Sequence, residues 1–216
     1  MTMEIKNLVE KHLQNNQPSA WFEELYAQAN QNPQQIPWAH LQPNQQLIEW
    51  LKNNPIHGKQ KPQAVIIGCG LGDDAQAFAE AGYHVTAFDV SPTAINWCKQ
   101  RFPHSPVDYV TADIFHLPSP WQQKFDLIWE CRTIQALPLN VRAQVIKQVV
   151  ALAKPTAKIL VSTHIRTTEE APNGPPWPLS SGELNQFKQL GWQEKCRSTI
   201  HRENNPISIA MIEYQQ

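Results

Sequence analysis

The sequence predicts an α/β protein built on a doubly wound, mostly parallel sheet of seven strands, with helices on both faces. From residue 64 to about residue 163, short apolar runs alternate with amphipathic helical patterns, as in successive strand–helix–strand units. Two further alternating runs close the chain, and they are joined too tightly for a helical crossover. We therefore expect an antiparallel strand at one edge of the sheet.

The first 60 residues differ from the rest of the chain. They are rich in Gln and Asn, hold five prolines and show no strand pattern, and helical spacing indicates helices near residues 5–13, 20–29 and 44–53. This segment lacks the apolar content for a core of its own. We therefore expect residues 1–60 to form a helical arm or lid on a ligand-binding domain that spans residues 61–216.

Seven short runs in the ligand-binding segment are predicted to be strands, at 64–67, 84–88, 107–112, 125–129, 158–163, 192–199 and 207–214. Helices are expected between them at 73–81, from Ser91 to before Pro103, from Asn140 as N-cap to a break at Pro155, and at 181–190. Gly82 and Gly191 mark helix ends. Four tryptophans within these elements, Trp50, Trp97, Trp129 and Trp192, are interpreted as core residues.

Composition excludes several classes of protein. The formal net charge is −1, so no positive field is available to hold a nucleic-acid backbone. No apolar run approaches the ~20 residues that span a bilayer, and residues 1–10 lack the apolar core of a secretory signal. The four cysteines lie far apart without a CxxC pair, which predicts reduced thiols, no metal site and a cytoplasmic location. The sequence does not distinguish between a monomer and a homodimer.

The strongest local signal is the run Gly68-Cys69-Gly70-Leu71-Gly72, which joins a strand to a helix. Glycines at such a junction allow a sharp turn and the close approach of a ligand. Asp89 ends the following strand, where a carboxylate can accept both hydroxyls of an adenosine ribose, and Asp113 follows the third strand, where an adenine edge would lie. The structural alternatives are that the glycines form only a tight turn and that Asp113 only caps the next turn. The glycine turn, Asp89 and Asp113 occur together at the ends of successive strands, and this combination favours an adenosine site.

The residues after Gly70 distinguish between adenosine ligands. A dinucleotide fingerprint needs a small residue three positions after this glycine, but the sequence has Asp73 there, followed by Asp74. Two carboxylates at the start of a helix would repel a pyrophosphate. They suit a ligand without phosphate and with a positive end, and S-adenosylmethionine has both properties.

The segments 64–72, 85–91 and 112–115 resemble the cofactor motifs of class I S-adenosylmethionine-dependent methyltransferases, which have a Rossmann-like fold. The resemblance extends toward the group of thiopurine S-methyltransferases and halide or thiol methyltransferases. The added features are the segments 21–26, 36–38, 136–138 with the helix around Arg142, and 174–178. The sequence departs from the pattern of this group in two places. Residues 154–157 lack the usual glycine pair, and residues 130–133 do not match any one member of the group.

The resemblance implies a methyl transfer from S-adenosylmethionine to a small-molecule acceptor, with S-adenosylhomocysteine as the product. It places Trp38 over the methionine end of the cofactor. Together with the glycine turn, it gives the expected cofactor contacts: Trp38, Gly68, Cys69, Gly70, Gly72, Asp73, Asp89, Val90, Asp113, Ile114 and Glu130. The acceptor is left open among sulfur, halide, nitrogen, oxygen and metalloid, and only the resemblance favours sulfur.

Methyl transfer from a sulfonium is an in-line displacement, so the protein mainly positions the reactants and excludes water. We therefore assign no catalytic triad or base. Candidates for the acceptor pocket are Trp38, Arg132, His164 and Trp177, and Arg166 is a further candidate for contact with an acidic acceptor. Aromatic faces can attract a sulfonium. For Trp38 and Trp177, the alternative is that each tryptophan only fixes a proline-rich loop. For Glu130, the alternative is an ion pair with Arg132 or another base. For His164 and Arg166, it is a solvated charge just past the end of a strand.

Three other functions remain as alternatives. One is a catalytically inert module that only binds S-adenosylmethionine, and another is an NAD-dependent oxidoreductase. Asp73 and the lack of a separate substrate domain argue against the oxidoreductase. The third is nucleic-acid methylation, for which the sequence has neither a basic stripe nor a base-recognition motif.

Overall fold

The computed structural model describes residues 2–58, 60–201 and 207–216, and the chain divides into two units, residues 1–113 and 114–216. The helical arm belongs to the first unit together with the first three strands. None of the helices in the described ranges is both long and apolar enough to cross a membrane.

The first unit holds three parallel strands in the order β3-β2-β1. Its elements are α1 (Met3–Gln14), α2 (Ala20–Gln28), η1 (Pro33–Gln35), α3 (Gln45–Asn53), β1 (Gln63–Ile67), α4 (Asp73–Glu80), β2 (His84–Asp89), α5 (Pro92–Arg101) and β3 (Asp108–Thr111). Strands β1 and β2 are almost continuously buried, as expected for parallel strands that are covered on both faces.

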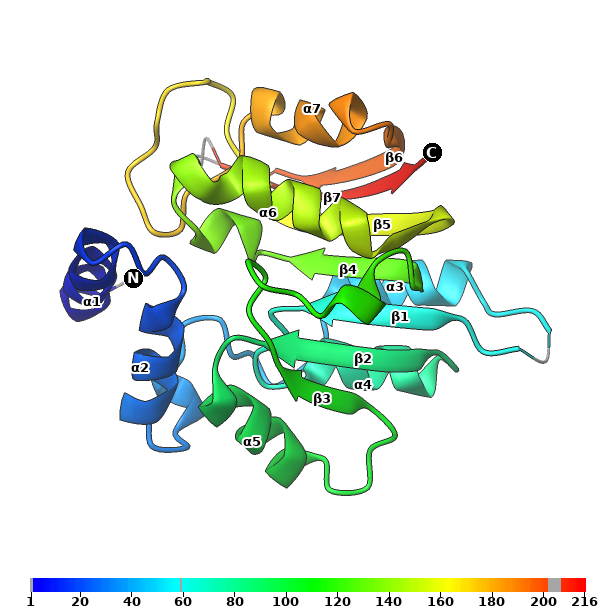
Figure 1. Ribbon diagram of the computed structural model, residues 1–216, viewed down its shortest axis with the longest axis horizontal. Coiled ribbons are helices and arrows are strands. Elements are labelled where there is room, and N and C mark those ends of the chain that lie inside the picture. The colour runs from blue at the N-terminus through cyan, green and yellow to red at the C-terminus, as the bar shows by residue number, and fades with distance from the viewer. Residues whose placement is uncertain (1, 59, 202–206) are drawn as a thin grey trace. The chain divides into compact units, whose positions relative to one another are not determined.

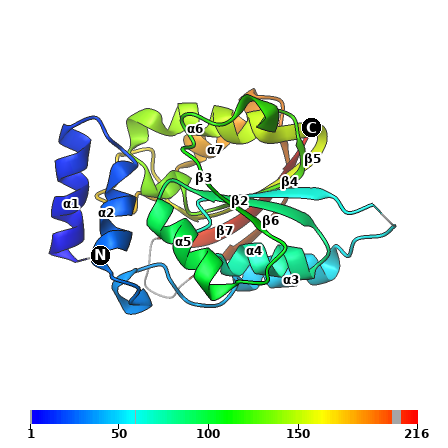
Figure 2. The same cartoon turned by 60° about the horizontal axis from the view of Figure 1, so that its bottom comes forward.

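Helices cover the strands of this unit and also extend beyond them. Helix α4 packs on β1 and β2, and α5 packs on β2 and β3. Helix α2 lies between α1 and α5, near the ends of β2 and β3 at which those strands finish (Figure 1). Figure 2 shows α3 beside α4. The arm is therefore packed at the side of the first unit where β2 and β3 end.

Local sequence signals account for the ends of these helices. Ser91 caps α5 by accepting the amide of Ala94, and Pro92 occupies the first helical position. Asn44 caps α3 in the same way. Gly82 follows the end of α4 with φ +98°, a conformation that glycine adopts without strain. These starts and stops are close to the predicted ones.

The second unit holds four strands in the order β4-β5-β7-β6. Its elements are η2 (Ser119–Trp121), β4 (Phe125–Cys131), η3 (Ile134–Ala136), α6 (Leu139–Leu152), β5 (Ala153–Ile165), α7 (Ser181–Gln189), β6 (Gln193–Ile200) and β7 (Ser208–Gln215). Strand β5 is parallel to β4, and β7 is antiparallel to both β5 and β6. The antiparallel strand β7 thus lies one place inside the edge strand β6.

The seven strands of the described residues match the predicted α/β fold, but three details of the prediction were wrong. Asn140 does not cap α6, because the helix starts at Leu139 after Pro138 and has no side-chain cap. The helix ends at Leu152, and Pro155 lies inside the longer strand β5 instead of at a turn. Trp50 is half-buried, whereas Trp97, Trp129 and Trp192 are core residues as expected.

Candidate cofactor and acceptor sites

The glycine turn between β1 and α4 requires glycine for two physical reasons. Gly68, Gly70 and Gly72 all have positive φ, at 59°, 55° and 88°. A Cβ on Gly72 would lie 2.6 Å from the Tyr109 hydroxyl, and one on Gly70 would lie 3.3 Å from the Tyr26 hydroxyl. The turn therefore combines an unusual backbone path with close neighbours on both sides.

Asp89 ends β2 with its carboxylate directed at this turn. Oδ2 accepts the amide of Gly70 at 3.0 Å, and Oδ1 accepts the amide of Ser91 at 3.0 Å. The Val90 amide also favours the ionised carboxylate. A carboxylate has about four acceptor positions, so these amides do not exhaust its capacity. Burial of this carboxyl raises its pKa to about 6, although the bonds from Ser91 and Gly70 oppose that shift. The geometry fits the predicted role as an acceptor for two ribose hydroxyls.

Trp38 lies beside the same turn, within an aromatic cluster of the arm. Its indole Nε1 donates to the Tyr26 hydroxyl at 2.8 Å, and its ring meets those of Trp21 and Phe22 edge to face. Its Cδ1 lies 4.0 Å from the position of a Cβ on Gly70. Trp38 is half-buried, so part of its surface remains open beside the glycine turn. This placement is compatible with a wall of a ligand site.

Asp73 has a different environment from the one that the sequence suggested. Both of its carboxylate oxygens accept bonds from the Arg101 guanidinium, at 2.9 and 2.8 Å, and the same guanidinium donates to the carbonyl of Leu71. Asp74 accepts the amide of Asn44. The Arg101 guanidinium therefore compensates the charge of Asp73, which weakens the argument that the helix start repels a pyrophosphate. The predicted contact of Asp73 with the cofactor remains a prediction.

Glu130 is a buried carboxyl at the end of β4 in the second unit. Its Oε1 accepts the amides of Thr133 and Ile134, at 2.6 and 2.9 Å, and Oε2 has no hydrogen-bond partner among the described residues. Burial raises the pKa of Glu130 to about 7, against the opposing effect of these two amides. A buried acceptor without a partner is the kind of atom that a donor on a ligand would complete.

Arg132 follows Glu130 with φ +67°, an uncommon conformation for a residue with a side chain. Its amide donates to the carbonyl of Ser162 on β5, which holds the backbone in this path. Such strained residues gather at functional sites, which agrees with the choice of Arg132 as a pocket candidate. The role itself remains a prediction.

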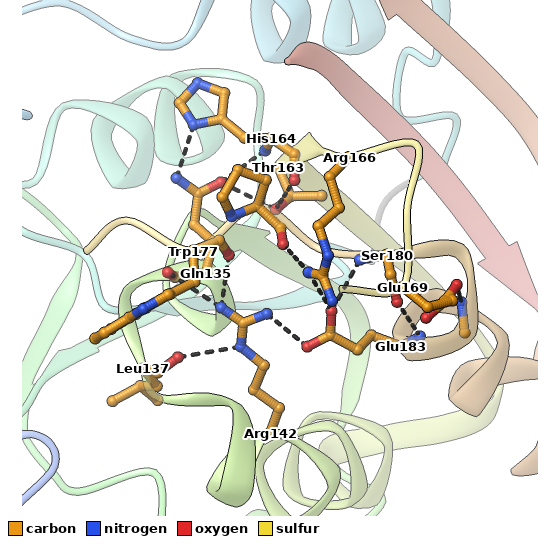
Figure 3. A network of polar contacts seen from close by, with 12 residues as sticks. Gln135, Leu137, Arg142, Thr163, His164, Arg166, Glu169, Trp177, Ser180 and Glu183 are labelled. Atoms are coloured by element: carbon orange, nitrogen blue, oxygen red, sulfur yellow. Dashed lines mark hydrogen bonds and ion pairs between the residues drawn. The ribbon is translucent and has the colours of Figure 1, made fainter. Parts of the chain in front are cut away.

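A buried polar network, drawn in Figure 3, holds the segment between β5 and α7. Arg142 donates to the carbonyls of Leu137 and Trp177 and to Glu183 Oε1, the last at 2.5 Å. Glu183 also binds Arg166 through Oε2 at 2.7 Å. Arg166 is thus committed to an internal ion pair, and its suggested contact with an acidic acceptor has no support in the structure.

Gln135 joins His164 and Trp177 within this network. Its side-chain carbonyl accepts the amide of His164 at 2.6 Å, and its side-chain amide contacts His164 Nδ1 at 3.0 Å. Its backbone carbonyl accepts the amide of Trp177 at 2.8 Å. The structure therefore brings together two of the predicted pocket candidates, and their contact with an acceptor remains a prediction.

The remaining predicted contacts lie at the ends of strands. Val90 follows β2 and is half-buried, Asp113 lies just after β3 and is half-buried, and Ile114 is 5% exposed. Cys69 is part of the glycine turn and carries a free thiol. Nothing in the geometry of the described residues assigns a ligand to these four residues, so their cofactor contacts remain predictions. 

The sequence analysis gave no role to several residues that organise these sites, although the resemblance included the segment 21–26 and the helix around Arg142. Glu23 and Tyr26 on α2 contact the edge of the first unit, and Gln135, Arg142 and Glu183 form the network of the second. A signal for Glu183 was present in the pattern Ser180-Ser181-Gly182-Glu183, which is a capping box at the start of α7. Glu23 and Gln135 have no comparable local signal, because their side-chain partners are 28–70 residues distant.

The fold, the glycine turn and the carboxylate that ends β2 place the chain in the class of Rossmann-like proteins to which the class I methyltransferases belong. The model of the thiopurine S-methyltransferase family matches residues 24–207. The chain therefore belongs to the thiopurine S-methyltransferase family.

Two plant relatives are similar to parts of the chain. A probable thiol methyltransferase 2 of Arabidopsis thaliana is 29% identical over 127 residues, which cover 56% of this chain and 54% of the relative. A thiocyanate methyltransferase 1 of Brassica oleracea is 25% identical over 155 residues, 68% of this chain and 64% of the relative. The chain thus spans only about half to two thirds of the length of these relatives.

Solved structures confirm the fold over most of the chain. The N-methyltransferase NodS from Bradyrhizobium japonicum, in complex with S-adenosylhomocysteine, has a TM-score of 0.67 at 16% identity and covers 89% of this chain and 96% of its own. A Burkholderia thailandensis 1,6-didemethyltoxoflavin-N1-methyltransferase has a TM-score of 0.68 at 15% identity, with 92% and 90% covered. These identities establish a shared fold alone.

Proposed function

We propose that the protein is a methyltransferase that uses S-adenosylmethionine to methylate a small-molecule acceptor, releasing S-adenosylhomocysteine. The observation that carries this proposal is the Asp89 carboxylate, which two backbone amides hold at the end of β2 beside the glycine turn. Family membership and the methyltransferase relatives support the same reading.

The residues of the first unit fit this cofactor. Asp89 offers its carboxylate to the two ribose hydroxyls, and Trp38 offers an aromatic face for the positive methionine end. Glu23 and Asp89 place two carboxylates near this edge, which favours a cationic ligand over a phosphate. When bound, S-adenosylmethionine supplies an activated methyl group on a sulfonium. The protein's contribution is to bind, orient and exclude water.

For the acceptor we propose a soft, anionic or easily ionised nucleophile of the thiol or thiocyanate type. The names of the two plant relatives support this class, and the sequence resemblance pointed to it. Such a nucleophile needs no dedicated base, so the proposal assigns none. Arg132, His164 and Trp177 are our candidates for contact with it.

An acceptor screen with methyl-labelled S-adenosylmethionine tests the proposal. The panel contains thiols, thiocyanate, halides, thiopurines and small amines, and the readout is labelled product together with S-adenosylhomocysteine. Label transfer to a thiol or to thiocyanate is the expected result. Binding of cofactor without transfer to any member would favour the inert module instead, and calorimetric binding of NADH without binding of S-adenosylmethionine would favour the oxidoreductase.

We further propose that residues 1–45 act as a lid over the cofactor, because the arm carries Trp38 and packs at the edge of the first unit. Deletion of residues 1–20 removes α1 and should weaken cofactor binding and slow turnover. If neither quantity changed, α1 would have no part in closing the site.

A further inference from the structure

Glu23, on the first turn of α2, uses both carboxylate oxygens to hold the loop that follows β2. Oε2 accepts the Ser91 hydroxyl at 2.5 Å and the Thr93 amide at 3.1 Å, and Oε1 accepts the Thr93 hydroxyl at 2.6 Å. The carboxylate also lies at the start of α5, where a negative charge is favourable. These three bonds join the arm to a segment about 70 residues away in the sequence.

Ser91 connects this contact directly to Asp89. The Ser91 hydroxyl donates to Glu23 and accepts the amide of Ala94, while the Ser91 amide donates to Asp89 Oδ1 at 3.0 Å. The orientation of the Asp89 carboxylate therefore depends on the path of Ser91. Glu23 fixes that path from outside the loop.

The same helix carries the aromatic neighbours of the glycine turn. Tyr26 follows Glu23 by three residues, which places the two side chains on one side of α2. The Tyr26 hydroxyl accepts the Trp38 indole and lies 3.3 Å from the position of a Cβ on Gly70. A displacement of α2 would therefore move the Asp89 side and the Trp38 side of the glycine turn together.

We propose that Glu23 is a positioning residue for the cofactor, which locks α2 onto the β2–α5 loop and so sets both the Asp89 carboxylate and the Trp38 wall. This inference rests on the proposed function. Glu23 itself does not touch the cofactor in this proposal, and it acts through Ser91 and Tyr26.

The test is the affinity of the full-length protein for S-adenosylhomocysteine, measured by calorimetry on Glu23→Gln and Thr93→Val. Glu23→Gln removes the charge, and Thr93→Val removes one hydroxyl while it keeps the backbone donor. Each variant should bind about tenfold more weakly, the effect of one lost charge-assisted hydrogen bond. Thr93→Ser should restore binding, because it returns a hydroxyl to the same position.

Glu80→Gln is the control, since it makes the same substitution at the exposed last residue of α4, away from the β2–α5 loop and from α1. Its affinity should remain that of the wild type. Hydrogen exchange of residues 20–38 and 89–93 should show that ligand protects both segments in the wild type and fails to protect 20–38 in Glu23→Gln.

The possible outcomes separate the two proposals. Failure of the wild type to bind S-adenosylhomocysteine would contradict the proposed function. Binding by the wild type with unchanged affinity in both Glu23→Gln and Thr93→Val would overturn the positioning role. A lower melting temperature of the free variants without a change in affinity would show a purely structural contact and would also overturn it. If Glu23→Gln does not fold, Thr93→Val and Thr93→Ser decide the question.

Discussion

The backbone amide of Gly70 donates to the Asp89 carboxylate at 3.0 Å, so the glycine turn and the end of β2 are joined by a direct hydrogen bond. This contact couples the shape of the turn to the position of the only carboxylate that ends a strand in the described residues of the first unit. The predicted role of Asp89 as a ribose acceptor depends on this contact.

Replacing Asp89 by alanine should weaken the binding of S-adenosylhomocysteine by ~1.5–3 kcal/mol. The variant loses charge-assisted hydrogen bonds to the ribose and leaves the Gly70 amide without its acceptor. Calorimetry measures the change. Asp108→Ala is the control, because Asp108 is an exposed carboxylate on the neighbouring strand β3. Unchanged binding in Asp89→Ala would mean that the ribose lies elsewhere.

Binding of S-adenosylhomocysteine should weaken as the pH falls below about 6. Burial raises the pKa of Asp89 to about 6, and only the ionised carboxylate accepts hydrogen bonds on both oxygens. Protonation therefore removes one acceptor, and affinity should fall by up to about tenfold per pH unit in the acidic limit. Calorimetry between pH 5 and 8 tests this. The change in affinity per pH unit should be smaller in Asp89→Asn than in the wild type. An equal change in both proteins would assign the pH dependence to another group.

The sequence allowed the fold and the glycine turn to be predicted because their signals are local. Apolar runs mark β1 and β2, and Ser91-Pro92 and Gly82 mark helix ends through their own backbone preferences. Asp89 could be located because it directly follows such a run. The cap of α6 was misplaced because an Asn near a helix start resembles an N-cap, whereas here Pro138 precedes the first helical residue.

The contacts that hold the sites could not be predicted, because they join residues far apart in the chain. The partner of Asp73 is Arg101, 28 positions away, and this pair compensates one of the two carboxylates at the start of α4. The bonds from Glu23 span 68 and 70 positions. Such pairs follow from the packing of helices on strands, and a single sequence carries no periodic signal for them.

Gly72→Ala should lower the free energy of unfolding by ~2–4 kcal/mol. The new Cβ would lie 2.6 Å from the buried Tyr109 hydroxyl and 3.1 Å from the Cys98 sulfur, and φ at this position is +88°. Urea unfolding measures the loss. Gly58→Ala is the matched control, since φ there is +114° and no atom lies within 4 Å, so it should show only the backbone cost of about 1 kcal/mol. Equal losses would rule out the steric contribution.

Glu130→Gln should stabilise the protein at pH 8 and have little effect at pH 4.5. Burial raises the pKa of Glu130 to about 7 from 4.5, so the folded state holds the proton more tightly than the unfolded state. Wild-type stability from this group is therefore greatest below pH 4.5 and falls as the pH rises to about 7. Glutamine cannot ionise and keeps an oxygen for Thr133 and Ile134. The gain at pH 8 should be ~1–3 kcal/mol in urea unfolding. A loss of stability at pH 8 would show that the charged form is needed.

Glu183→Gln should destabilise the protein far more than the loss of an exposed ion pair. Glu183 lies between the guanidinium groups of Arg142 and Arg166, whose side chains are 1% and 9% exposed, so the neutral variant leaves two buried positive charges without a counter-ion. Breaking such a pair typically costs ~3–5 kcal/mol.

Urea unfolding at pH 7 measures this loss, with Glu194→Gln as the control. Glu194 pairs with Arg197 on β6 and its side chain is 39% exposed, so its replacement should change stability by about 0–1 kcal/mol. Burial alone would raise the pKa of Glu183, but the bonds from Ser180 and Arg142 outweigh it and lower that pKa, so the wild-type advantage should decline as acid protonates the carboxylate. If Glu183→Gln and Glu194→Gln lost equal stability, the network in Figure 3 would not stabilise the second unit.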